Sequence, residues 1–265
     1  MKKYLSFWLL KWQQAATHRL RLVIWILFDL SSPLLMMLVF GSIYTQSTPS
    51  IRGLNYPSLI TYYTLVILVS ILVDSHIDET LEKLIERGDI ANYLVKPLSL
   101  LITNLVDEFA WKCFRLLLYL PFLVTLLLLF RNRLTLDVSL TTLPFVFLSL
   151  LQASLLFFLL RYSLGLLSFF FTEVWGIVNL QAALVMLLSG KLLPLTFFPP
   201  VLQQVNQFLP FQYLLAFPVS LLQGQVKPSQ IPLGLAIQGF YVLLFLWIQS
   251  LLFKKGLRQV GVVGH

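Results

Sequence analysis

Charged side chains are scarce in this sequence, and cysteine is nearly absent. Charged residues make up 11% of the 265 residues, against about 25% in soluble proteins, while 58% are hydrophobic. So few polar side chains cannot cover a soluble globule, and so many apolar ones exclude a disordered chain. The single cysteine, Cys113, excludes an intrachain disulfide. The composition, with a mean hydropathy of +0.85, predicts an integral membrane protein.

The sequence also lacks the common catalytic motifs. Its only Gly-Lys pair is Gly190-Lys191, and Val185 stands where a phosphate-binding loop needs glycine. Neither the zinc-protease motif nor the nucleophile elbow of serine hydrolases occurs. The three histidines, at positions 18, 76 and 265, are far apart in sequence and have no metal-ligand spacing. We therefore expect no catalytic residue, no metal site and no nucleotide hydrolysis by this chain.

Six apolar stretches approach or exceed the length of about 20 residues with which a helix crosses a bilayer. They are residues 22–44, 58–73, 109–130, 142–160, 174–190 and 231–253. We expect the turn between the fourth and fifth stretches within residues 161–173. The fold class predicted is all-α integral membrane, with six transmembrane helices in a single domain over residues 1–265.

The distribution of positive charge predicts the orientation. Six spans place both termini on one side, and 14 of the 19 Lys and Arg residues then fall on that side. Cytoplasmic segments are rich in Lys and Arg, so we expect cytoplasmic termini. The same rule accounts for the net charge of +8, and we expect no nucleic-acid partner. No internal repeat is evident, which counts modestly against a secondary transporter.

The first 21 residues are amphipathic, with aromatic anchors such as Trp8 and Trp12 among basic residues. This pattern suits a helix that lies in the inner membrane interface before the first span, although a plain basic flank would look similar.

Residues 74–99 form the longest polar stretch and carry six of the 11 acidic residues. Ser75 and Asp78 have the spacing of a capping box, and Glu79 can pair with Lys83 one turn later. Gly88 can end this helix. We expect an amphipathic helix in a cytoplasmic loop, serving either as a docking element for a cytoplasmic partner or as a solvated connection.

Residues 191–230 are too apolar for an ordinary exposed loop, yet they are interrupted by Pro194, Pro199, Pro200, Pro210 and Pro218. Two half-length helices that enter the outer leaflet and return, as a re-entrant helical hairpin before the last span, fit better than two full spans. The alternative is a structural lid without substrate contact.

A few polar residues within the spans are candidates for function. Asp29 lies in the first span, either in an interhelix pair or in gating. Glu108 and Lys112 have ion-pair spacing at the start of the third span, and Asp107 can approach Arg115. The possible substrate pathway consists of Thr61, Tyr62 and Thr64 on the second span and Asn179 and Gln181 on the fifth. Polar residues of this kind also mediate helix packing.

Four motifs, in this order around six spans, resemble the permease subunits of ABC-2 type exporters, and among them a group of small bacterial six-span permeases. They are IERGDIANYLVKPLS at 85–99, SGKLLPL at 189–195 followed by Phe198-Pro199, Leu209-Pro210-Phe211, and Lys255-Gly256-Leu257-Arg258. The basic amphipathic start of the chain fits the same pattern, and the resemblance covers nearly the whole chain.

The resemblance implies a permease of the bacterial plasma membrane that exports an amphiphilic substrate, such as a drug or lipid. A coupling helix at residues 77–93 would dock on a separate ATP-binding cassette subunit, which binds ATP and Mg²⁺, so this chain itself needs no cofactor. The docking residues would be Glu79, Glu82, Lys83, Ile85, Glu86, Arg87, Gly88, Asp89 and Tyr93.

In the same resemblance, residues 190–222 re-enter the outer leaflet and cap the pathway, with Gly190, Pro194, Pro199 and Pro210 as cap residues. The second and fifth spans would line the interface between two permease copies or two related permeases, surrounded by membrane lipid. Two rival interpretations stay open at this point: a secondary transporter or channel without an ATPase, and a membrane scaffold that transports nothing.

Overall fold

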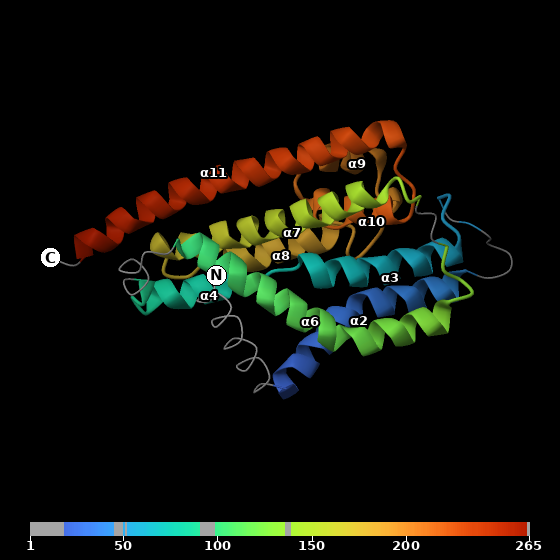
Figure 1. Cartoon of the computed structure of the whole chain (residues 1–265), viewed down its shortest axis with the longest axis horizontal. Helices are drawn as coiled ribbons and strands as arrows, with labels where there is room; N and C mark the ends of the chain where they lie inside the picture. The colour runs from blue at the N-terminus through green and yellow to red at the C-terminus, as the bar shows by residue number, and fades with distance from the viewer. Residues whose placement is uncertain (1–18, 45–49, 51, 91–98, 136–138, 264–265) are drawn as a thin grey trace.

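The structure is a computed structural model that describes residues 19–44, 50, 52–90, 99–135 and 139–263 (Figure 1). Within these residues the secondary structure is helical, and no strand occurs. The predicted interfacial helix at residues 1–21 falls mostly outside the described residues, as does Tyr93.

Six apolar helices correspond to the six predicted stretches. They are α2 (Arg19–Ile43), α3 (Tyr56–Val73), α6 (Leu100–Phe130), α7 (Leu143–Gly165), α8 (Trp175–Leu188) and α11 (Ile231–Val263). The short 3-10 helix η1 (Leu166–Phe169) follows α7, so the turn into α8 lies within the predicted range. The helices lie roughly along one axis, with α4 (Ile77–Glu86) and the end of α11 at the left of Figure 1.

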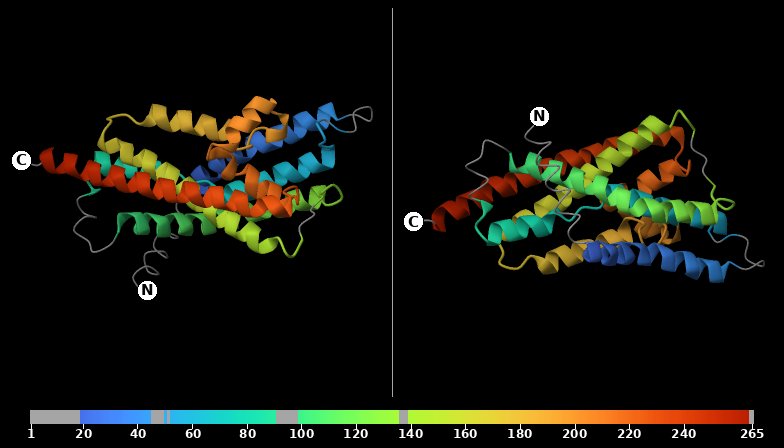
Figure 2. Two further views of the ribbon diagram at one scale, coloured as in Figure 1. Left: turned by 90° about the horizontal axis from the view of Figure 1, so that it is seen from above. Right: turned by 60° about the horizontal axis from the view of Figure 1, so that its bottom comes forward.

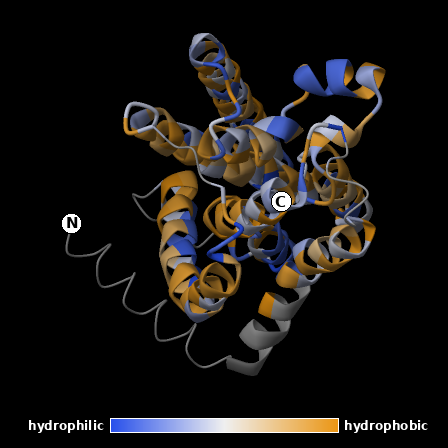
Figure 3. Cartoon of the chain, turned by 90° about the vertical axis from the view of Figure 1, so that its right-hand side faces the viewer, coloured by the Kyte–Doolittle hydropathy of each residue, from blue (hydrophilic) through white to orange (hydrophobic). Residues whose placement is uncertain are grey.

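Four stretches are long and apolar enough to cross a membrane, which supports the prediction of a multi-pass membrane protein. They are Tyr56–Glu86, Leu100–Phe130, Leu143–Phe169 and Pro228–Gln259. The apolar helices Asp29–Ile43 and Trp175–Leu188 are shorter, so crossing by the first and fifth stretches stays a prediction. Apolar residues occupy most of the long helices when the molecule is viewed from its right-hand end (Figure 3).

Two helices extend beyond the spans predicted for them. α6 begins nine residues before the predicted third span, and α11 continues ten residues past the predicted end of the sixth. The added residues of both helices include charged side chains, such as Glu108 in α6 and Lys254 in α11. In α6, Glu108 lies 3.7 Å from Lys112, as predicted, and this ion pair allows the helix to carry both charges.

α3 lies at the centre of the bundle. Twelve of its 18 residues are buried, and it contacts α2, α6, α7 and α10 (Ala216–Leu222). α11 packs along α7. Because α3 is enclosed by the rest of the chain, whatever holds its two ends also positions the segments attached to them.

Candidate functional site

α4 has one side on the bundle and one side free. Ile77, Asp78 and Leu81 are buried, while Thr80, Lys83 and Glu86 are exposed. Glu79 pairs with Lys83 at 3.7 Å, as the sequence predicted. The remaining docking candidates are arranged as follows: Glu82 and Ile85 are partly exposed, and Arg87, Gly88 and Asp89 form an exposed turn. The structure thus brings the described docking residues together on and just after one short helix.

Two contacts hold α4 against α7. Arg161 donates from Nη1 to Asp78 Oδ2 at 2.9 Å, and both side chains are largely buried. Near this ion pair, a Cβ at Gly165 would lie 2.8 Å from Leu81 Cβ and 3.0 Å from Asp78 Cα. Only a glycine allows this close approach of the two helices. The predicted capping box is wrong, because His76 is the N-cap of α4 and Asp78 faces α7 instead.

Cations surround the C-terminal end of α3, where the last helical carbonyls have no partner within the helix. Arg115 Nη2 donates to the carbonyls of Ser70, Ile71 and Asp74 at 3.2, 2.9 and 3.1 Å. Lys112 Nζ donates to the Val73 carbonyl at 3.1 Å. The approach of Asp107 to Arg115 that their spacing allows stays a prediction. Spacing along one helix could not predict these carbonyl partners on another helix.

A buried ion pair completes this region. Lys191 Nζ lies 2.8 Å from Asp74 Oδ2, although the two residues are 117 positions apart. Asp74 is only 6% exposed. We call Asp74, Lys112, Arg115 and Lys191 the junction cluster. The sequence-based prediction placed Lys191 at the start of the outer segment 191–230 and did not pair it with Asp74. The available signal was a lone lysine amid apolar residues of a membrane protein.

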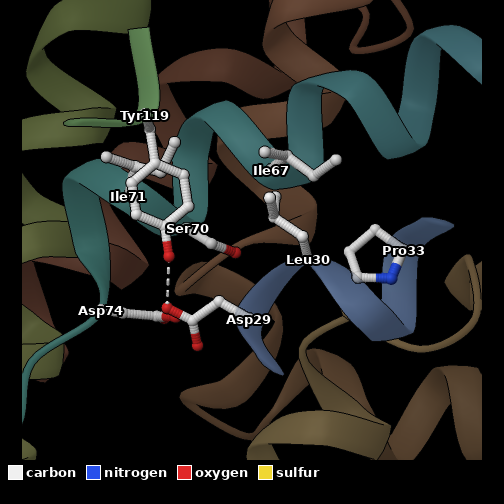
Figure 4. A pocket seen from close by; sticks show the side chains of 8 residues that line it. All are labelled: Asp29, Leu30, Pro33, Ile67, Ser70, Ile71, Asp74 and Tyr119. Atoms are coloured by element: carbon white, nitrogen blue, oxygen red, sulfur yellow. Dashed lines mark hydrogen bonds between the residues drawn. The ribbon is translucent and has the colours of Figure 1, made fainter. Parts of the chain in front are cut away.

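Asp29 lies beside the junction cluster (Figure 4). Tyr119 Oη donates to Asp29 Oδ2 at 2.8 Å, so Asp29 of α2 is bonded to α6. Of the two roles expected for Asp29, the structure provides the interhelix pair. The pair borders a small cavity, with about the space of one water molecule. The lining residues are Asp29, Leu30, Pro33, Ile67, Ser70, Ile71, Asp74 and Tyr119.

Residues 190–222, the cap segment, form a series of short helices, and their entry into the outer leaflet as a re-entrant hairpin stays a prediction. The short helices are η2 (Leu195–Phe197), α9 (Pro200–Gln207), η3 (Phe211–Tyr213) and α10. Three predicted cap residues have a common role: Pro194, Pro199 and Pro210 are the N-caps of η2, α9 and η3. Proline suits this position because its ring presets the backbone and no N–H is left unpaired.

The start of the cap segment is fixed on the middle of α3. Tyr62 Oη donates to the Gly190 carbonyl at 2.7 Å, and Tyr63 Oη donates to the Leu192 carbonyl at 3.0 Å. Gly190 has φ +86°, and a Cβ there would lie 2.5 Å from Tyr62 Oη. Gly190 is therefore needed both for its conformation and for its lack of a side chain.

The predicted pathway residues do not share one environment. Thr61 and Thr64 are buried and donate to carbonyls of α3 itself, while Tyr62 bonds to the cap segment. Asn179 is exposed on α8. Gln181 is buried, and neither atom of its amide has a partner in the described chain. The α3 group thus has hydrogen-bond partners within the protomer, whereas the Gln181 amide has none among the described residues.

Comparison with known proteins gave one match. A sequence model of the family described as "ABC-2 family transporter protein" matches residues 30–262. No curated protein and no solved structure matched the chain.

Proposed function

Because this chain belongs to the family of ABC-2 transporter proteins, we propose that it is the permease subunit of an ATP-driven exporter in the bacterial plasma membrane. ATP and Mg²⁺ bind to a separate ATP-binding cassette subunit on the cytoplasmic side, where both termini lie. The substrate class proposed is amphiphilic, such as a drug or lipid. The rival interpretation as a non-transporting scaffold has less support, because the matching family is one of transporters.

The observation that carries the proposal is the exposed, acidic side of α4. A solvated connecting helix does not need to be held rigidly, yet α4 is held by the Asp78–Arg161 ion pair and by the close approach at Gly165. Its outer side, with the turn at Arg87–Asp89, stays available to a partner. A basic cleft on the ATP-binding subunit would complement the outward acidic residues.

A second permease copy, or a related permease, is proposed to cover α8. Gln181 and Val185 are the buried residues of α8, and most of its other side chains are fully or partly exposed. A neighbouring permease would cover these exposed apolar side chains. This arrangement assigns α8, with Asn179 and Gln181, to the interface where a substrate pathway would form.

The test is to reverse the charge on the outer side of α4. Glu82→Lys with Glu86→Lys should abolish co-purification of the ATP-binding subunit and the ATPase activity of the complex, because the paired surfaces would then repel. Membrane insertion and thermal stability should stay unchanged, since both side chains are at least partly exposed. The matched control is Lys227→Met, an exposed charge far along the chain from α4.

The possible outcomes separate the interpretations. A reversed variant that still binds a stoichiometric ATPase would contradict the docking surface on α4. A wild-type chain that repeatedly purifies folded but without any ATPase would favour a secondary transporter or channel.

A further inference from the structure

The Asp74–Lys191 ion pair joins the two segments to which separate roles are proposed above. Asp74 is the C-cap of α3, and three residues later α4 begins at Ile77. Lys191 is the second residue of the cap segment. The carboxylate and the ammonium group lie 2.8 Å apart, with side chains 8% and 19% exposed. A direct contact therefore connects the candidate docking helix with the cap.

On the α4 side, Asp74 has little freedom to move independently. Its backbone N–H donates to the Ser70 carbonyl at 2.9 Å, and its own carbonyl accepts from Arg115 at 3.1 Å. A link of two residues, Ser75 and His76, connects it to α4. Any displacement of α4 relative to α7 would therefore act on Asp74 and on the Asp78–Arg161 ion pair together.

On the cap side, the backbone around Lys191 is equally constrained. The flanking carbonyls of Gly190 and Leu192 accept from Tyr62 and Tyr63 on α3. The Leu192 N–H donates to the Met186 carbonyl of α8 at 3.1 Å. In the same way, the Ala216 N–H at the start of α10 donates to the Ser189 carbonyl at 2.9 Å. A force on the Lys191 side chain would therefore reach α8, α10 and the cap segment.

The burial of the pair distinguishes it from a surface ion pair. Glu79 and Lys83 are 42% and 58% exposed, so water can replace either partner. Removal of either residue would leave the other charge buried without its nearest counterion, which is unfavourable. The two groups are therefore expected to move together instead of separating.

We propose that Asp74 and Lys191 are positioning residues that transmit the movement of α4 to α8 and the cap segment. The ion pair would thereby couple ATP hydrolysis in the partner subunit to rearrangement of the cap. This inference rests on the proposed function, because it requires an ATP-binding subunit docked on α4.

The experiment follows the cap directly and needs no identified substrate. In a Cys113→Ser background, Phe208→Cys places a single thiol on the cap segment, at a position that is 81% exposed. The permease is purified with its ATP-binding subunit, and the rate of labelling by a fluorescent maleimide is measured with and without Mg²⁺-ATP. We expect ATP to change this rate about fivefold or more, as in typical coupled sites.

The decisive variant carries Asp74→Asn and Lys191→Met together. Removing both charges leaves no unpaired charge in the interior, so this variant should fold. We expect it to bind the ATP-binding subunit and hydrolyse ATP, while the ratio of labelling rates with and without ATP falls to about one. The charge-swapped variant, Asp74→Lys with Lys191→Asp, should recover part of the response, and Lys227→Met should retain all of it.

Each outcome decides between a coupling role and a purely structural one. If the neutral double variant keeps the wild-type response to ATP at the cap, the inference is overturned, because the pair then only stabilises the fold. If the neutral variant does not fold, the charge-swapped variant decides the question. A charge-swapped protein that hydrolyses ATP, but whose labelling rate at the cap does not change with ATP, contradicts transmission by the ion pair. If wild-type protein binds no ATPase, both the proposed function and this inference fail, which is seen before any variant is scored.

Discussion

α3 and α8 are both apolar helices, yet they occupy opposite environments in the protomer. Twelve of the 18 residues of α3 are buried, whereas two of the 14 residues of α8 are. α3 lies among several other helices, and α8 follows the edge of the bundle (Figure 2).

The two helices also differ in the hydrogen-bond partners of their polar groups. Thr61 and Thr64 of α3 bond to its own carbonyls and Tyr62 bonds to the cap segment, while Arg115 and Lys112 donate to its C-terminal carbonyls. α8 has a buried amide without a partner at Gln181. A helix enclosed by its own chain serves as a scaffold, whereas the exposed apolar side chains of α8 form a surface that a neighbouring chain can cover.

The strongest test of this comparison shortens the same side chain in both helices. Ile67→Ala on α3 should lower the free energy of unfolding by about 2–5 kcal/mol, because Ile67 is 2% exposed and the change leaves a cavity. Ile177→Ala on α8 should lower it by less than about 1 kcal/mol, since Ile177 is 38% exposed. The measurement is denaturant unfolding of protomers dispersed in detergent. Equal losses would contradict the comparison.

The contact between the end of α8 and α3 can be tested at Gly190. Gly190→Ala should lower stability by about 2–4 kcal/mol, from backbone strain at φ +86° and from overlap with Tyr62 Oη. Gly53→Ala is the matched control, because Gly53 has φ +81° but a Cβ there would meet no atom within 4 Å. It should show the strain alone, at about 1–2 kcal/mol. Similar losses for both variants, compared by thermal unfolding, would mean that the contact with Tyr62 contributes little.

The smallest expected effects are changes in stability of opposite sign when two helical glycines are replaced by alanine. Gly176→Ala on α8 should raise stability by about 0.5–1 kcal/mol, because a Cβ there meets nothing within 4 Å and alanine favours a helix. Gly165→Ala, where α7 approaches α4, should lower stability by about 1 kcal/mol or more. Chemical denaturation of the two single variants measures both signs. A loss at Gly176 in dispersed protomers would show that α8 is packed more closely than its exposure indicates.

Much of the fold could be predicted from the sequence because it depends on local properties. The apolar stretches, the proline positions, the Glu79–Lys83 pair and the helix-ending Gly88 follow from composition and spacing along one helix. Gly88 indeed has φ +72° after α4. Predictions failed where a partner came from another element: the N-cap of α4 and the placement of the Lys191 side chain.

By itself, the sequence determined that this is a multi-pass helical membrane protein, because hydrophobicity over about 20 residues decides whether a segment can enter a bilayer. It also identified the family through motifs in a fixed order. Only the tertiary structure decided that α3 is the enclosed helix, that α8 is open, and that Asp74 meets Lys191. The physical reason is that burial and ion pairing depend on distances in space, and residues 117 positions apart become neighbours only when the whole bundle has packed.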